Sequence, residues 1–209
     1  MPTTIDNETE LSAVNSILAS IGQSPIDTLD YSNPEIDFIY KLLREANIDT
    51  QNEGWEFNIE RHVTTTKDAY DRFPIATNVL RYDVTDGQIY RTYDVIRKYK
   101  DGIPYLYDKV NHKFEFTNID TLDLDVVIAV PFEELPSVFQ RYITYRASVR
   151  AAIQLVSNPQ LVELLRVQEA QARANCVEYE CNQGDHSFMG WEAETSYNAF
   201  QPYKSLRRH

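Results

Sequence analysis

The feature that most constrains the fold is a change in hydrophobic period along the chain. Near both ends apolar residues recur every three or four positions, which is typical of helices with one buried face. In the middle, apolar and polar residues alternate, which is typical of strands. The pattern predicts an α+β fold, with helices at both chain ends and antiparallel strands between them. The expected boundaries are 1–54 and 132–181 for the helical domain, 55–131 for the β domain and 182–209 for a C-terminal arm.

The first two helices have recognisable ends. Glu8–Gly22 is expected to be the first, because Gly22 and Pro25 are typical of a helix end. Its apolar stripe consists of Leu11, Val14, Leu18 and Ile21. The second is expected to begin with Asn33 as N-cap and Pro34 at the first helical position, and to end at Gly54. Its buried face is expected to hold Ile36, Ile39, Leu43 and Ala46.

Two more helices are expected near the C-terminus. One should run from Pro136 to about Val156, and its course is marked by Phe139, Tyr142, Ile143, Ala147, Arg150 and Ile153. Asn158-Pro159 then repeats the combination of cap and proline, and the last helix should reach about Tyr179. Its stripe consists of Leu161, Leu165, Gln168, Ala172 and Cys176.

The middle of the chain contains several strand and turn signals. Alternation over Trp55–Glu60 predicts a strand with one buried face. Asp86-Gly87 predicts a hairpin, and a second hairpin is expected where a polar link joins 105–107 to 114–116. Leu124–Val130 is apolar and rich in β-branched residues, so we expect it to be the central strand.

Charge is distributed unevenly. The net charge is −12 over 209 residues. Residues 1–60 hold 12 acidic and 2 basic side chains, a net of −10, which leaves −2 for the rest. A protein that grips nucleic acid needs a basic surface to neutralise phosphates, so we expect no specific DNA binding. The acidity is explained either by solubility or by a surface that does not adhere to passing DNA.

Membrane and secretion signals are not evident in the sequence. No run of 18 apolar residues occurs, so no membrane span is expected. The segment Met1–Asp6 lacks the basic and apolar regions of a secretory signal, so we expect synthesis in the cytoplasm.

The sequence offers no positive sign of catalysis. The four histidines occur in unrelated settings, and no nucleophile elbow or phosphate-binding glycine loop is present. Cys176, Cys181 and His186 lack the short cysteine spacing of a zinc site, and we expect both thiols to be reduced. We therefore predict no catalytic, cofactor-binding or metal-binding residues and no enzymatic activity.

Two groups of residues are candidates for protein contacts. Arg141, Arg146 and Arg150 lie along one expected helix, where they form either a solvated face or an intersubunit face that meets the acidic N-terminal helices of a neighbouring copy. The segment after residue 181 is either a disordered end or an arm that docks on a partner through aromatic anchors and arginines. The candidate arm residues are Trp191, Tyr197, Phe200, Tyr203, Arg207 and Arg208.

Four blocks of sequence carry a family resemblance. They are Glu10–Gly22, Gly54–Glu60, Leu135–Ser148 and Glu169–Glu180. Taken in this order, they resemble the tail tubular protein A family, the head-to-tail adaptors of T7-like short-tailed bacteriophages. Residues 61–121 and the segment after Cys181 depart from the family pattern.

The resemblance implies a helical bundle domain formed by both chain ends, with an inserted antiparallel β domain. It also implies a structural role in the neck of the virion tail. Members of the family form a ring of twelve copies that joins the portal protein to the tail nozzle (tail tubular protein B), helps to seat the tail fibres and surrounds the channel through which the genome leaves. On this reading, the aromatic and basic arm docks on the portal protein. The alternative is a tail-associated enzyme that degrades surface polysaccharide.

Overall fold

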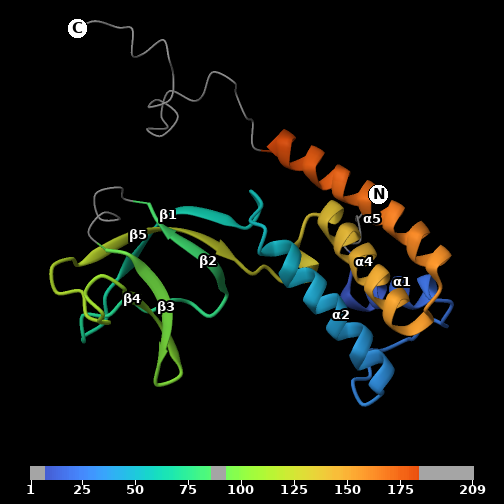
Figure 1. Cartoon of the computed structure of the whole chain (residues 1–209), viewed down its shortest axis with the longest axis horizontal. Coiled ribbons are helices and arrows are strands. Elements are labelled where there is room, and N and C mark those ends of the chain that lie inside the picture. The colour runs from blue at the N-terminus through green and yellow to red at the C-terminus, as the bar shows by residue number, and fades with distance from the viewer. Residues whose placement is uncertain (1–7, 86–92, 184–209) are drawn as a thin grey trace, which may run out of the picture.

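Helices drawn from the two ends of the chain pack together into one body, and the strands between them form a second body beside it (Figure 1). The computed structural model describes residues 8–85 and 93–183. Within these residues the long helices are α1 (Glu10–Ser20), α2 (Pro34–Gln51), α4 (Ser137–Ala151) and α5 (Pro159–Gln183). The mixed α+β fold with helices at both ends and strands inserted between them is therefore confirmed.

The caps of the first two helices follow from their sequence. Thr9 is the N-cap of α1, because its side-chain oxygen accepts a hydrogen bond from the Ser12 N–H at 3.2 Å. Gly22 follows the helix with φ of +81°, a conformation that glycine adopts without steric cost. Asn33 caps α2 as predicted and accepts from the Glu35 N–H at 3.0 Å. All four residues expected on the buried face of α2 are buried.

Helix α4 is regular only as far as Ala151. It continues as a single π-helical turn, η2 (Ala152–Val156), which ends at Ser157 with φ of +52°. The wider turn changes the direction in which side chains leave the helix. Ile153 consequently lies at the surface, although Phe139, Tyr142, Ile143 and Ala147 of the predicted stripe are buried. Helix α5 runs four residues beyond the predicted end at Tyr179.

Three antiparallel strands form the larger sheet. They are β1 (Ile59–Thr66), β2 (Val79–Val84) and β5 (Thr121–Ile128), in the order β1-β5-β2. The central position predicted for the apolar segment near residue 124 is confirmed. Leu122, Leu124 and Val126 of β5 are buried, and Asp123 and Asp125 alternate with them on the other face.

The smaller sheet is a hairpin that the sequence analysis assigned incorrectly. It consists of β3 (Val95–Lys100) and β4 (Ile103–Asp108), joined by Asp101-Gly102 with both residues at positive φ. The hairpin expected between 105–107 and 114–116 is reduced to a single antiparallel bridge between Asp108 and Lys113, because residues 114–116 form no strand. Asp108 caps the following loop by accepting from the Val110 N–H at 2.8 Å, and Phe116 is fully buried in the core. The hairpin predicted at Asp86-Gly87 lies outside the described residues.

The segment Trp55–Asn58 is a turn, so the strand predicted over it is also wrong. The N–H groups of Asn58 and Ile59 both donate to the Trp55 carbonyl, at 2.9 and 3.1 Å. The Asn58 side chain closes the turn by accepting from the Trp55 N–H at 2.8 Å. Strand β1 begins only at Ile59, because the preceding residues of the alternating segment form the turn.

Gln51 and Asn58 connect the helical body to the β body. The Gln51 side chain donates to the Val130 carbonyl at 2.9 Å and accepts from the Val130 N–H at 2.7 Å. Asn58 donates to the carbonyls of Gln51 and Ile128, at 3.0 and 3.1 Å. Both side chains are fully buried. The two bodies are therefore joined by directional contacts from two amide side chains.

Candidate assembly surfaces

Two of the three candidate arginines of α4 form ion pairs with α2 of the same chain. The Arg146 guanidinium lies 3.1 Å from the Glu53 carboxylate, just after the end of α2. Arg150 pairs with Asp49 and lies 3.9 Å from Glu45. The structure thus pairs these two arginines with acidic side chains of the same subunit, whereas the sequence predicted either a solvated face or contacts with a neighbouring copy.

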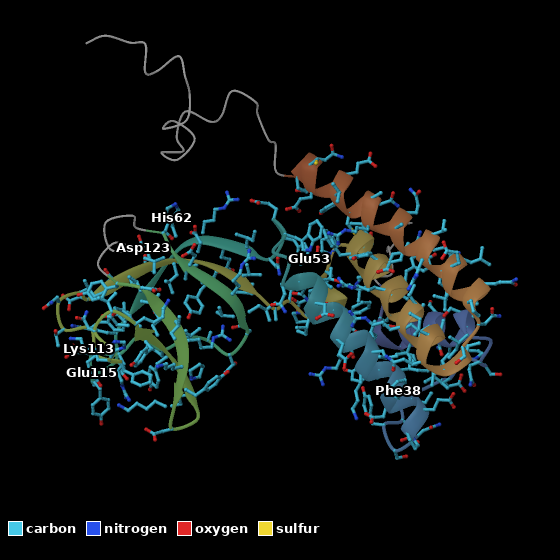
Figure 2. All side chains as sticks on the ribbon, in the orientation of Figure 1. Phe38, Glu53, His62, Lys113, Glu115 and Asp123 are labelled. Carbon is cyan, nitrogen blue, oxygen red and sulfur yellow. The ribbon has the colours of Figure 1, made fainter. Side chains whose placement is uncertain are left out.

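Glu53 is the centre of this network and lies where the helical body meets the β body (Figure 2). Besides Arg146, it pairs with Arg173 of α5, whose guanidinium lies 2.9 Å from the second carboxylate oxygen. Arg173 also donates to the Tyr142 hydroxyl at 3.0 Å. The hydrogen bonds to Tyr142 and Glu53 raise the pKa of Arg173. One carboxylate therefore connects the end of α2 to both C-terminal helices.

Sequence reasoning missed Glu53 as a site residue. Its partners Arg146 and Arg173 lie 93 and 120 positions away, so no local spacing indicates the contact. The available signal was the surplus of carboxylates in residues 1–60, which indicates that some of them pair with distant arginines.

Substitution of Glu53 by glutamine should lower the free energy of unfolding by about 1 kcal/mol at low ionic strength, because the amide keeps an acceptor but loses the charge shared by two arginines. Since salt screens charges, the difference from the unmodified protein should shrink in about 1 M NaCl. Urea unfolding at both ionic strengths measures this. Asp37→Asn, which removes the exposed pair with Lys41, is the matched control and should change stability by less than about 0.5 kcal/mol. Equal losses for the two variants would contradict a special role for Glu53.

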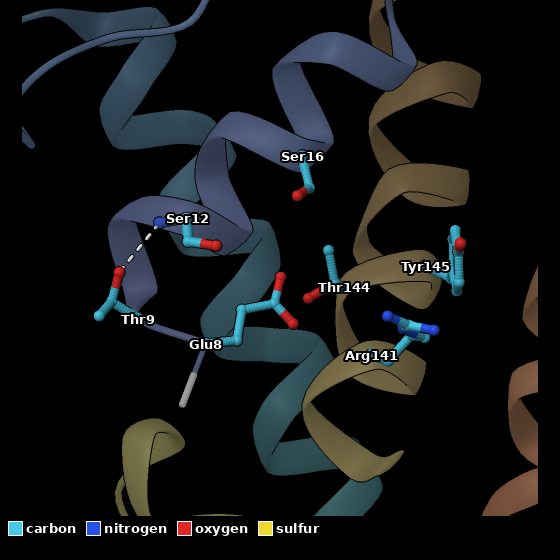
Figure 3. Close-up of a pocket in the computed structure, with 7 residues that line it drawn as sticks. All are labelled: Glu8, Thr9, Ser12, Ser16, Arg141, Thr144 and Tyr145. Atoms are coloured by element: carbon cyan, nitrogen blue, oxygen red, sulfur yellow. Dashed lines mark hydrogen bonds between the residues drawn. The ribbon is translucent and has the colours of Figure 1, made fainter. Parts of the chain in front are cut away.

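Arg141, the third candidate, lies in a different setting. It lines a groove of about 760 Å³ between α1 and α4, and Figure 3 shows it near Glu8 and Thr144. The complete lining is Glu8, Thr9, Ser12, Ser16, Arg141, Thr144 and Tyr145. Burial raises the pKa of Glu8, and the charge of Arg141 partly offsets this effect. Arg141 is exposed, so among the three arginines it is the one most available to a partner.

The two cysteines are free and occupy unlike environments. Cys176 is buried on α5, and its thiol donates to the Val138 carbonyl at 3.4 Å. Burial raises the pKa of the Cys176 thiol to about 12. Cys181 is exposed. His186, the third member of the grouping considered from the sequence, lies outside the described residues.

The different exposure of the two cysteines predicts how many thiols react with a reagent in the native protein. Ellman's reagent should modify one thiol per chain in the native protein at neutral pH and two after unfolding, because only an accessible thiolate reacts. Cys181→Ser should therefore leave a native protein with almost no reactive thiol. Rapid modification of that variant would mean that Cys176 is not buried as described.

The remaining predictions from the sequence concern metal sites, membrane spans and the C-terminal arm. Residues 8–85 and 93–183 contain no group of three or more His, Cys, Asp or Glu side chains arranged to hold a metal ion. The helices in the same part of the chain are too short or too polar to cross a membrane. The candidate arm residues Trp191, Tyr197, Phe200, Tyr203, Arg207 and Arg208 lie outside the described residues.

The fold defines a class, a mixed α+β protein whose helical ends enclose an inserted β segment. The family model for tail tubular proteins matches residues 11–186, and the chain therefore belongs to the tail tubular protein family. It is a structural component of the phage tail. No curated protein shows significant similarity to the chain.

Proposed function

We propose that this tail tubular protein is the head-to-tail adaptor, a ring that joins the portal protein to the tail nozzle protein (tail tubular protein B) and contributes to the seat of the tail fibres. The family match carries the proposal, because it extends from α1 to just beyond α5 and includes the inserted strands. Its role is assembly, without enzymatic activity and without a cofactor. The blocks of sequence that resemble tail tubular protein A favour the adaptor over the nozzle.

The ring would form through heterologous contacts, in which one face of each subunit binds a different face of the next, with twelve copies closing the circle. Arg141 is the strongest of the three arginines for an intersubunit role, because Arg146 and Arg150 already pair with α2 of their own chain. Genomic DNA would pass through the centre without specific binding, since like charge on an acidic wall discourages adhesion.

The primary experiment is sedimentation velocity together with electron microscopy of the protein, alone and mixed with its portal ring. We expect a ring of subunits on the portal. A protein that stays monomeric and does not bind the portal would contradict the adaptor role. Release of reducing ends from host capsule by the purified protein would instead favour the polysaccharide-degrading alternative.

The C-terminal segment is the proposed portal-binding arm. A chain that ends at Gln183 should bind the portal ring at least about tenfold more weakly, because aromatic and arginine anchors contribute most of the affinity of such interfaces. Its melting temperature should stay close to that of the full chain, since α5 is retained. Surface-immobilised portal rings provide the binding measurement. Unchanged affinity would show that portal contacts lie elsewhere.

A further inference from the structure

Helix α5 has two apolar faces on opposite sides. The inner face holds Leu165, Ala172 and Cys176, which are buried against the other helices. The outer stripe, as we name it, consists of Leu164, Val167, Ala170, Ala174, Val177 and Cys181, all of which are exposed. The spacing of three and four residues places these side chains along one side of the helix, over about 26 Å. A surface helix normally has one apolar face, so the second face needs an explanation.

The outer stripe includes large side chains with high exposure. Leu164 is 67% exposed, Val167 62% and Val177 46%. The neighbouring η2 turn, which contacts α5, adds further exposed apolar side chains, those of Ile153, Leu155 and Val156. Several large exposed apolar side chains on one helix and the turn before it are typical of a protein–protein contact.

The position of α5 determines which contacts are possible. It lies at the edge of the helical body beside α4, and α2 lies on the other side of α4 (Figure 1). Helix α2 has a solvent face of its own, formed by Lys41, Arg44, Glu45 and Ile48. Two different faces on opposite sides of one subunit are what a heterologous ring requires.

The charges beside the two faces are complementary. Arg166 borders the outer stripe one turn before Ala170, and it makes no ion pair within the described residues. Helix α2 carries the carboxylates of Glu35, Asp37, Glu45 and Asp49. Glu45 lies on its solvent face and has a side chain that is 66% exposed. Asp37 and Asp49 already pair with Lys41 and Arg150 of their own chain, so the exposed carboxylate of Glu45, 3.9 Å from Arg150, is the acidic partner open to Arg166 of another subunit.

We propose that the outer stripe of α5 packs on the solvent face of α2 of a second copy of this chain. The inference rests on the proposed ring assembly and names its interface. Each copy then uses α5 on one side and α2 on the other, so that the chain of contacts continues from subunit to subunit. Ile48, which is 38% exposed on α2, is the central apolar contact for Val167.

The test uses two variants that each disable one face. Val167→Glu places a carboxylate in the outer stripe, and Ile48→Glu places one on α2. Each variant alone should self-associate about 100-fold more weakly than the unmodified chain, because a charge at the centre of the contact is left without a partner. A mixture of the two should give a heterodimer and nothing larger, since only one intact pair of faces remains. Val110→Glu, at an exposed apolar position of the β body, should assemble normally.

Sedimentation velocity, circular dichroism and electron microscopy on portal rings distinguish the outcomes. Normal assembly of Val167→Glu would overturn the inference and leave the proposed ring intact. Loss of assembly in both variants without heterodimer formation would exclude α2 as the partner face. Normal assembly of Val167→Glu in the full chain, together with stronger self-association of the chain that ends at Gln183, would mean that the C-terminal segment covers the outer stripe, and this result would overturn the inference. If the unmodified chain forms no ring, alone or on the portal, the proposed function itself is contradicted.

Discussion

Substitution of Phe139 by alanine should lower the free energy of unfolding by about 4 kcal/mol, the largest effect expected from a single change in this chain. Phe139 is fully buried on α4. Its ring centroid lies 4.9 Å from that of Trp55, 4.6 Å from Phe57 and 5.9 Å from Tyr179. The substitution would remove three aromatic contacts and leave a cavity where α4, α5 and the turn after α2 meet.

Urea unfolding followed by tryptophan fluorescence measures this loss, because Trp55 is in direct contact with the ring. Phe139→Leu is the matched control, and it should cost no more than about 1.5 kcal/mol because most of the volume is kept. The m-value should stay constant in both variants if only the native state is affected. A loss below about 2 kcal/mol for the alanine variant would mean that the surrounding helices close the cavity.

Much of the helical body could be predicted because its signals are local. Caps such as Asn33 and the stop at Gly22 act on neighbouring backbone groups, and the apolar stripe of α2 repeats within one segment. These features do not depend on what the rest of the chain does. The same holds for β5, whose apolar composition indicated a central strand before any partner was known.

The errors in the β body arose from competing turn signals. Asp101-Gly102 is the same kind of hairpin signal as Asp86-Gly87. The longer polar link after residue 108 competes with it and predicts a different hairpin. The alternation after Trp55 predicts a strand, because apolar residues recur at every second position. The Asn58 side chain overrides that period by bonding the backbone of its own turn. A turn that is stabilised by a side-chain hydrogen bond cannot be recognised from hydrophobic periodicity.

The charged contacts were predictable in kind but not in location. The acidic surplus of the first 60 residues indicated contacts between helix arginines and these carboxylates as one of two alternatives, and between subunits. Whether Arg146 and Arg150 make these contacts within a subunit or between subunits depends on how α2 and α4 pack, which no sequence spacing encodes. The outer stripe of α5 does not stand out in the sequence, because the inner face alone accounts for a helix with one apolar side.

Substitution of Asn58 by alanine should lower the free energy of unfolding by about 3 kcal/mol, because one buried backbone N–H loses its hydrogen-bond partner and two backbone carbonyls each lose a donor, although the Gln51 carbonyl still accepts from the Gly54 N–H. These groups are the Trp55 N–H and the carbonyls of Gln51 and Ile128, which the Asn58 side chain joins at 2.8 to 3.1 Å. Chemical unfolding measures the loss. Asn52→Ala is the matched control, since Asn52 is exposed, and it should change stability by less than about 0.5 kcal/mol.

Asn58→Asp separates the accepting role of this side chain from its donating role. At neutral pH the introduced carboxylate can still accept from the Trp55 N–H, but it cannot donate to the carbonyls of Gln51 and Ile128, so the variant should be at least as unstable as Asn58→Ala. The protonated carboxyl donates one hydrogen bond, and the folded state therefore binds the proton more tightly than the unfolded state does. Stability relative to the unmodified protein should accordingly rise as the pH falls from 7 toward about 4. A pH-independent difference would mean that the accepting hydrogen bond alone holds the turn between the helical and β bodies.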